Sequence, residues 1–364
     1  MALTRIPAPA IADVREPNFR NIIINGDMAV AQRGTSTSSV SSGSTYVVDR
    51  TFVYVTNGGT WTMSQDTAVP SGSGFAKSIK LDCTTADASL GAADYIAMQQ
   101  RIEGQNLQYI KKGTSSAESL TLSFWVYATK TGTNICELYD ADNTRQISKS
   151  YTVNTTNTWE KKTITFAGDT SGTLDNDNAT SMTLLFWLGA GSNFTSGTLN
   201  TSWGSATNAN RAVGQVNHAD STSNNFYITG IQLEAGSVAT DFEVVPYDVN
   251  LQRCYRYYYL HASGSGPSIS QASAYNTNDA FGIVFYKTSM RTTPTLSTAT
   301  GTNYYSFIGS GTSTNFNGPL VLSQANTEAC QLAFSSFSGA LTQGDAGGFR
   351  MNNGSALIAF AAEL

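Results

Sequence analysis

The sequence has few charged residues, since only 13% of its 364 positions are Asp, Glu, Lys or Arg, against about 25% in an ordinary soluble domain. Ser, Thr, Asn and Gly occupy many of the remaining positions, and these residues disfavour long helices. The chain still holds 17 Phe, 17 Tyr and 5 Trp, which is more apolar surface than a disordered chain carries. The composition therefore predicts an all-β protein with many turns and room for two or three domains.

Other absences exclude classes of partner. The net charge is −5, so there is no basic field for a phosphate backbone, and we expect no nucleic-acid partner. No apolar run reaches the length of about 18 residues that a membrane span needs, so we expect no membrane insertion. Pro7 and Pro9 interrupt the N-terminal stretch where a signal peptide would be apolar. The four cysteines lack CxxC spacing, which indicates buried free thiols and synthesis in a reducing cytoplasm.

The sequence contains few groups for catalysis. Its only histidines, His218 and His261, lie in polar segments without a Gly-x-Ser-x-Gly motif, so a His-assisted nucleophile is not expected. No phosphate-binding glycine motif occurs. The visible carboxylate pairs lie in the turn sequences DADN and DNDN and comprise Asp140 with Asp142 and Asp175 with Asp177. Asp ordinarily serves turn geometry there, so we predict no catalytic residue and no enzyme. An enzyme that cleaves glycans, a depolymerase that uses these carboxylate pairs, is kept as an alternative prediction.

Strict alternation marks the segment 119–166. Its first strand places one set of side chains, Leu120, Leu122, Phe124 and Val126, opposite a second set, Thr121, Ser123, Trp125 and Tyr127. Such a period of two is typical of a strand with one buried face. A second strong strand repeats the pattern, with Met182, Leu184, Phe186 and Leu188 on the apolar phase. The polar excursion from Gly189 to His218 that follows is too long for an ordinary connection and is a candidate functional loop.

Four strings occur in the order found in one known family. They are NIIINGDMAVAQRGTS, LSFWVYATKTG, TWEKKTITFAGDTSG and GIQLEAGSVATDFEVVP, between Asn21 and Pro246. This part of the chain resembles the carbohydrate-binding-module type of jelly roll found in bacteriophage tail fibres and other virion appendages. Three shorter strings, RCYRYYY, Met-Arg-x-x-Pro and LIAFAAEL, resemble the terminal module of phage tail-fibre proteins.

These patterns predict four parts of an all-β chain. Residues 1–20 form an extended N-terminal anchoring arm, residues 21–247 a jelly-roll β-sandwich, residues 248–258 a short linking helix, and residues 259–364 a second, β-sandwich-like domain. Near the start of the jelly roll, residues 22–24 are expected to form a short strand that ends at the turn sequence Asn25-Gly26-Asp27. The Ser/Thr-rich stretch 35–44 is expected to be a flexible loop.

Pro246 marks the boundary after the jelly roll, and Asp248 is a good helix cap. In the strand Phe226–Leu233 the apolar phase slips by one residue at Gly230, which predicts a β-bulge.

The proposed assembly contacts are apolar. The arm carries Leu3, Ile6, Pro7, Pro9, Ile11 and Phe19, an unusual content for a free terminus, and we expect it to order against other virion proteins. Tyr255 and Tyr257, in the RCYRYYY segment, are expected at an interface between copies of the chain. The family resemblance implies a homotrimer.

Aromatic residues are the predicted ligand contacts. Trp125, Tyr127 and Trp187 lie on the non-core phase of the two strong strands, and Trp61 and Trp203, together with Tyr95, could extend the surface from loops. Aromatic faces bind the C–H faces of sugar rings while neighbouring polar groups bond the hydroxyls. The alternative is that these rings are packed inside the subunit.

Modules of this type often hold a structural calcium between the first strand and the end of the domain. Asp27 and Asp241 lie at comparable places in this sequence. The acidic residue usual after the Asn-Gly-Asp motif is absent, because Met28 and Ala29 stand there. We therefore predict no metal and no obligatory cofactor, with calcium left as an open alternative.

Together these features predict a non-enzymatic virion protein, made in the host cytoplasm, that belongs to a tail fibre or related appendage and recognises host cell-surface glycans. The first alternative is a capsid decoration, head-fibre or neck assembly protein that uses the jelly roll only for assembly.

Overall fold

The computed structural model describes residues 19–364, which form two compact units. The first unit comprises residues 19–29, Ser36–Thr45 and Thr51–Pro246; the second comprises Val30–Thr35, Tyr46–Arg50 and Tyr247–Leu364. The units therefore differ from the contiguous domains predicted from the sequence, because two short N-terminal segments belong to the second unit. No helix among the described residues is long and apolar enough to cross a membrane.

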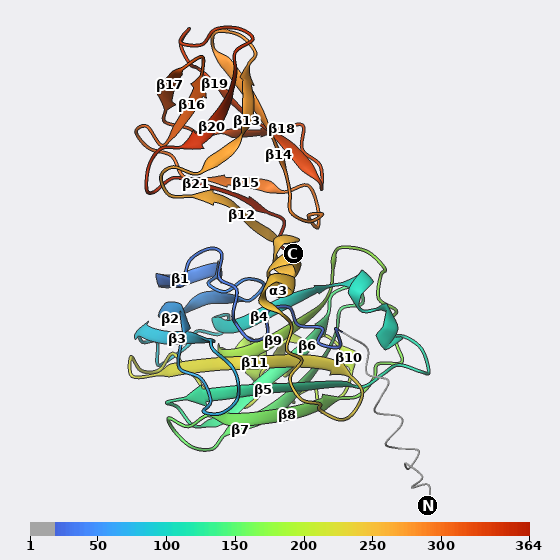
Figure 1. Ribbon diagram of the computed structural model, residues 1–364. Coiled ribbons are helices and arrows are strands. Elements are labelled where there is room, and N and C mark those ends of the chain that lie inside the picture. Colours follow the sequence, from blue (N-terminus) through green and yellow to red (C-terminus); the bar gives the residue numbers. More distant parts are fainter. Residues whose placement is uncertain (1–18) are drawn as a thin grey trace, which may run out of the picture. The chain divides into compact units, whose positions relative to one another are not determined.

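The first unit is an antiparallel β-sandwich (Figure 1). Its hydrogen-bonded strand order is β10-β7-β6-β9-β4-β2-β3-β11-β5-β8, with β1 paired to β2. The strands are β1 (Ser36–Tyr46), β2 (Phe52–Asp66), β3 (Ser78–Thr85), β4 (Tyr95–Glu103), β5 (Leu120–Ala128), β6 (Gly132–Asp140), β7 (Arg145–Val153), β8 (Glu160–Phe166), β9 (Thr180–Ala190), β10 (Gly204–Ser205) and β11 (Asn225–Ala235). Short helices η2 (Gly104–Asn106), η3 (Gln108–Ile110), α2 (Ser192–Thr195) and η4 (Asn208–Asn210) lie in the connections.

Strand β2 belongs to both layers of the sandwich. Its first part pairs with β4 and its last part with β3, and Gly58 and Gly59 lie between the two. Gly59 has φ +74°, and a Cβ atom there would lie 2.4 Å from the Thr85 carbonyl oxygen. Glycine is therefore required where the strand passes from one layer to the other. We call β10-β7-β6-β9-β4 with the start of β2 the first layer, and the end of β2 with β3-β11-β5-β8 the second layer.

The core forms where the two layers face each other. Phe124 of β5 makes edge contacts with Phe186 of β9 and Tyr151 of β7, each with ring centroids 5.0 Å apart. All three side chains are buried. The predicted apolar phases of both strong strands are confirmed, since Leu120, Leu122, Phe124, Val126, Met182, Leu184, Phe186 and Leu188 are all buried.

The predicted β-bulge is also confirmed. The register between β11 and β5 shifts between Thr229 and Gln232, and Gly230 within it has φ +62°. A Cβ atom at Gly230 would lie 2.5 Å from the ring of Phe75. The bulge therefore lets an aromatic ring of a neighbouring loop approach the backbone closely.

Two predictions near the N-terminus are wrong. The segment Ile22–Ile24 is not a regular strand, although the Ile22 amide donates to the Leu233 carbonyl at 2.8 Å. The Ser/Thr-rich stretch 35–44, predicted as a loop, lies mostly in β1. Leu3, Ile6, Pro7, Pro9 and Ile11 lie outside the described residues. Phe19 is more than half exposed, and its amide donates to the Glu243 carboxylate at 2.7 Å.

The second unit begins with helix α3 (Tyr247–Tyr255), which ends three residues earlier than predicted because Tyr258 starts a strand. Two antiparallel sheets follow, in the orders β12-β21-β15 and β17-β16-β20-β13-β14-β19-β18. Their strands are β12 (Tyr258–Ser263), β13 (Ser268–Ala274), β14 (Asp279–Phe285), β15 (Thr295–Thr298), β16 (Tyr305–Gly309), β17 (Thr312–Phe316), β18 (Val321–Ser323), β19 (Ala329–Ser335), β20 (Ala346–Met351) and β21 (Leu357–Ala361).

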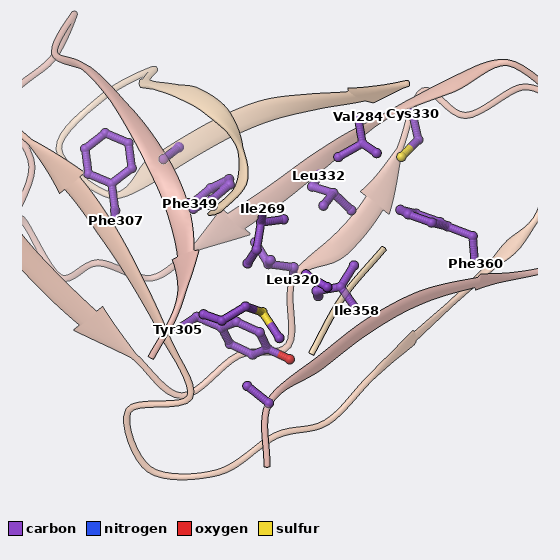
Figure 2. Close-up of a cluster of buried hydrophobic side chains, with 14 of the residues drawn as sticks. Ile269, Val284, Tyr305, Phe307, Leu320, Cys330, Leu332, Phe349, Ile358 and Phe360 are labelled. Atoms are coloured by element: carbon purple, nitrogen blue, oxygen red, sulfur yellow. The ribbon is translucent and has the colours of Figure 1, made fainter. Parts of the chain in front are cut away.

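Both sheets of the second unit contribute to one apolar core (Figure 2). Ile358 and Phe360 of β21 and Leu332 and Phe349 of the larger sheet are fully buried there. All four cysteines of the chain are buried free thiols. Tyr257 is buried beneath the Arg50 guanidinium, 3.4 Å from the ring centroid, and Tyr255 packs on Tyr259. The prediction that Tyr255 and Tyr257 lie at an interface between copies of the chain is therefore wrong for Tyr257, whose side chain is buried within the second unit.

The crossing of β2 between the layers gives a test of the fold. We expect Gly59→Ala to lower the free energy of unfolding by about 3 kcal/mol, because positive φ and overlap with the Thr85 carbonyl add. Gly72→Ala is the matched control, since Gly72 has φ +71° but open space around it, and it should cost about 1 kcal/mol. All five tryptophans lie in the first unit, so urea unfolding followed by tryptophan fluorescence reports on this unit. Equal losses would contradict the crossing geometry.

Candidate functional site

A cleft lies on the outer face of the first layer. Alternate side chains of β4, β6 and β9 that do not face the core point to this side, and the excursion after β9 folds over part of it. The cleft has a volume of about 490 Å³. We call it the first-layer cleft; its lining residues are Tyr95, Gln99, Arg101, Tyr139, Ala141, Thr180, Thr183, Leu185, Trp187, Phe194, Asn208 and Arg211.

The excursion is held on the sheet by backbone hydrogen bonds and a small apolar cluster. The Ala212 amide donates to the Phe194 carbonyl at 2.9 Å, and the Ser148 amide donates to the Asn200 carbonyl at 2.7 Å. Ala212 is fully buried against Ile135, Leu185 and other outward residues of the sheet. The segment predicted as a candidate functional loop therefore forms one wall of the cleft.

Tyr95 is at the centre of an aromatic group in the cleft. Its ring stacks on Tyr54 with centroids 5.3 Å apart and an interplanar angle of 12°. It also contacts the edge of Phe194 at 5.1 Å and lies 5.7 Å from Trp187. Tyr95, Tyr139 and Phe194 line the cleft and are half-buried, so each ring is partly covered by neighbours and partly open to a ligand. Tyr54 is half-buried outside the lining and supports the Tyr95 ring.

A buried carboxylate fixes the polar groups of the cleft. Glu137 lies beneath its surface and accepts hydrogen bonds from Trp187 Nε1 and Arg211 Nε, each at 2.9 Å. Burial raises the pKa of Glu137, while the charge and hydrogen bond of Arg211 lower it. The Arg211 guanidinium lies 5.1 Å from the Tyr139 ring centroid and 5.3 Å from that of Trp187. The Glu137 carboxylate and the rings of Tyr139 and Trp187 therefore hold the Arg211 guanidinium in place.

The cleft combines open aromatic rings with hydrogen-bonding side chains. Gln99, Asn208, Thr183 and Arg101 lie among the aromatic rings of the lining. Aromatic surfaces bind flat apolar faces, and amide, hydroxyl and guanidinium groups bond the hydroxyls at the edges of such a ligand. This arrangement is suited to a sugar chain.

The structure separates the aromatic residues predicted to form one surface. Trp187 belongs to the cleft but is only 1% exposed, with its indole nitrogen bonded to Glu137, so it supports the floor. Trp61 is fully buried and donates to the Gly58 carbonyl at 2.8 Å, so its prediction as a ligand contact is wrong. Trp203 is half-buried, donates to the Ala167 carbonyl at 2.7 Å and lies outside the cleft.

Trp125 and Tyr127 are half-buried on the outer face of the second layer, which is the other side of the sandwich. Trp125 and Trp187 therefore cannot contribute to one surface. Both follow the predicted outward phase of their strands, but the strands belong to different layers.

Several cleft residues were not predicted from the sequence. Tyr139, Arg101 and Gln99 lie on the outward phase of β6 and β4, so alternation alone could have identified them. Tyr54 of β2, which stacks on Tyr95 from outside the lining, also follows this rule. Phe194 and Arg211 lie in a Gly/Ser/Asn-rich excursion whose pattern gave no indication of which side chains face the sheet.

Three of the four paired carboxylates, those of Asp140, Asp142 and Asp177, take part in local interactions. Asp140 is buried, and the Lys112 ammonium lies 2.5 Å from its carboxylate, while Asp142 accepts the Asp175 amide at 2.9 Å. Asp177 accepts the Ala179 amide at 2.9 Å. Asp27 and Asp241 line one pocket beside Trp125. Within residues 19–364 no group of three His, Cys, Asp or Glu residues is placed to hold a metal ion.

Neither histidine lies in the cleft. His261 bonds the Tyr259 hydroxyl through Nδ1 and the Ile269 carbonyl through Nε2. His218 closes the excursion: its backbone amide donates to the Leu188 carbonyl, and its Nε2 lies 2.7 Å from Asn134 Oδ1. Because an amide oxygen only accepts, Nε2 must carry the proton. Burial lowers the pKa of His218 to about 4.

No protein-family model and no curated protein sequence matches the chain. Similar solved structures include a putative sugar-binding protein from Bacteroides thetaiotaomicron, with 12% identity and a TM-score of 0.32 over 59% of this chain and 99% of that one. Another is the family 11 carbohydrate-binding module of a cellulosomal cellulase from Clostridium thermocellum, with 13% identity and a TM-score of 0.28 over 55% and 99%.

A third similar structure is the enzymatically active domain of tailspike protein 4 from bacteriophage CBA120, with 12% identity and a TM-score of 0.30 over 59% of this chain. The alignment covers only 21% of the tailspike chain. Likenesses at this level of identity and TM-score carry no argument about function.

The burial of His218 predicts acid sensitivity. Below pH 6.5 the unfolded chain protonates this histidine while the folded chain resists protonation until about pH 4, so stability falls as pH decreases through this window. The full effect is about 3 kcal/mol. We expect His218→Gln, which keeps a donor for Asn134, to unfold with a weaker pH dependence between pH 6.5 and 4. Identical pH slopes in urea titrations of the two proteins would contradict a buried neutral histidine.

Proposed function

We propose that this protein is a non-enzymatic component of a phage tail fibre or related virion appendage, and that its first-layer cleft binds glycans of the host cell surface. The observation that carries the proposal is the half-buried aromatic group around Tyr95, set beside Gln99, Asn208 and Arg101. The resemblance of the sequence to modules of phage appendages supports the virion setting and synthesis in the host cytoplasm.

The cleft favours a sugar over a purely apolar ligand. Arg211 is held by Glu137 and lies near two rings, so a ligand meets aromatic surface and charged donors at once. A saccharide offers both an apolar ring face and polar edges. An apolar ligand would remove water from the side-chain amides of Gln99 and Asn208 without replacing the lost hydrogen bonds, which costs binding free energy.

The cleft is proposed to bind glycans without hydrolysing them. Glycoside hydrolysis ordinarily needs two carboxyl groups on either side of the scissile bond. None of the residues that line the first-layer cleft is Asp or Glu, and the nearby Glu137 is engaged by Trp187 and Arg211. The alternative of a depolymerase has no support from the Asp140–Asp142 and Asp175–Asp177 pairs, because none of these residues lines the cleft and three of the four carboxylates serve local structure.

For assembly, we propose that the arm of residues 1–20 binds other virion proteins. The second unit associates with copies of itself to form a homotrimer. One strand of this unit exposes large apolar side chains: Ile283 is 58% and Phe285 75% exposed on β14. Tyr275, which contacts Phe281 of the same strand, is 65% exposed. Such a strip supports an interface between subunits.

Glycan binding is tested with Tyr95→Ala. Affinity electrophoresis of the full chain in gels that contain purified host surface polysaccharide should show retardation, and the variant should bind about tenfold or more weakly, because truncation removes the central aromatic contact. Tyr247→Ala, at an exposed tyrosine outside the cleft, is the control and should bind normally. Loss of binding in both variants, or in neither, would refute the cleft as the site. A wild-type chain that binds no host glycan would favour the capsid or neck assembly role.

Self-association is tested with the double variant Ile283→Lys/Phe285→Lys. Light scattering should give a trimer mass for the wild type and a smaller mass for the variant, because two buried lysines would oppose the interface. Val238→Lys, at an exposed apolar residue of the first unit, should leave the mass unchanged. A monomeric wild type would contradict the proposal.

A further inference from the structure

A second pocket lies on the outer face of the second layer. It has a volume of about 380 Å³ and lies between strands β5, β8 and β11 and the loops before β3 and after β11. Its aromatic walls are Trp125, Phe75 and Phe242. We call it the second-layer pocket. The sandwich separates it from the first-layer cleft, and the two share no lining residue.

The β-bulge in β11 builds this pocket. Phe75 reaches the backbone at Gly230 only because no side chain is present there. The Thr229 hydroxyl donates to the Lys77 carbonyl at 2.6 Å, which fixes the loop before β3. Phe242 then packs on Phe75 edge to face, with centroids 4.9 Å apart. Two aromatic rings are therefore held in place beside Trp125 without filling the space above it.

An aromatic row continues from the pocket along the same face. Tyr127 lies two residues beyond Trp125 on β5, about 6.6 Å along the strand. Its ring contacts Tyr227 at 5.0 Å and Trp159 at 5.6 Å. All of these rings are half-buried. The row crosses neighbouring strands, so a chain-like ligand that leaves the pocket would remain on aromatic surface.

The polar groups of the pocket are of both signs. Lys77 and Lys161 line it together with Asp27 and Asp241, so the formal charges cancel. Within residues 19–364 neither lysine forms an ion pair with a carboxylate. The Ser123 hydroxyl also lines the pocket. Donors and acceptors around aromatic walls, without net charge, suit an uncharged ligand with many hydroxyl groups.

We propose that the second-layer pocket and its aromatic row form a second saccharide site, which takes a neutral sugar chain independently of the first-layer cleft. One subunit then engages two chains, or two segments of one chain, on opposite sides of its sandwich. Two weak sites on one subunit raise the overall affinity for a polymeric surface without any new contact. The proposal stands on its own residues and does not require the first site.

The test uses the full chain and a panel of neutral hexasaccharides of glucose, galactose, mannose, xylose or N-acetylglucosamine, followed by calorimetric titration. Tyr95→Ala leaves the second site intact, so at least one hexasaccharide should still bind this variant. Adding Trp125→Ala should weaken that binding about tenfold or more. Tyr95→Ala/Tyr247→Ala is the control and should bind like the single variant. A uronic-acid hexasaccharide should bind more weakly than its neutral counterpart.

Two further variants keep the result interpretable if Trp125→Ala does not fold. Trp125→Phe retains a ring and should lose less affinity than the alanine variant. Lys161 is an exposed lysine, and Lys161→Ala should weaken sugar binding about threefold. The proposal is overturned if no neutral hexasaccharide binds Tyr95→Ala, or if the Trp125 and Lys161 variants bind as the control does. Loss of subunit association instead of sugar binding in these variants would assign the face to a protein partner.

Discussion

The packing of Phe124 between Phe186 and Tyr151 determines the arrangement of the rest of the first unit. These rings lock the inner faces of two sheet layers together, and each strand of a sheet directs alternate residues to opposite sides. Once the apolar set of each strand is sealed inside, the other set must lie on the outside of its own layer. The sandwich therefore has two outer faces, and each carries its own set of aromatic side chains.

The two outer faces differ because their loops differ. On the first layer a long excursion folds back and covers part of the sheet, so Trp187 becomes a floor residue while Tyr95 and Phe194 remain open. On the second layer a bulge and two short loops surround Trp125, and a row of half-buried rings lies beside it. The first-layer cleft, which contains arginines, and the second-layer pocket, which contains lysines and aspartates, thus arise from the same strand alternation.

Local pattern predicted much of the fold and less of the site. Alternation gave the buried phases of β5 and β9, and the phase slip at Gly230 gave the bulge. Alternation could not assign a strand to a layer, which is why Trp125 and Trp187 were expected on one surface. Trp61 was expected in a loop, but it lies within β2 on the same phase as Val55 and Met63, so its side chain enters the core. The stretch 35–44 was mistaken for a loop because its Ser and Thr residues, mostly exposed in β1, carry no apolar phase.

The central claim is that a sugar chain occupies the outer face of the first layer. The most direct measurement is amide chemical-shift mapping by NMR of the full chain during titration with a host surface oligosaccharide. The account predicts that the largest changes occur at Tyr95, Arg101, Tyr139 and the excursion residues Phe194 and Asn208. Changes confined to the second unit, or an unperturbed spectrum at saturating oligosaccharide, would contradict it.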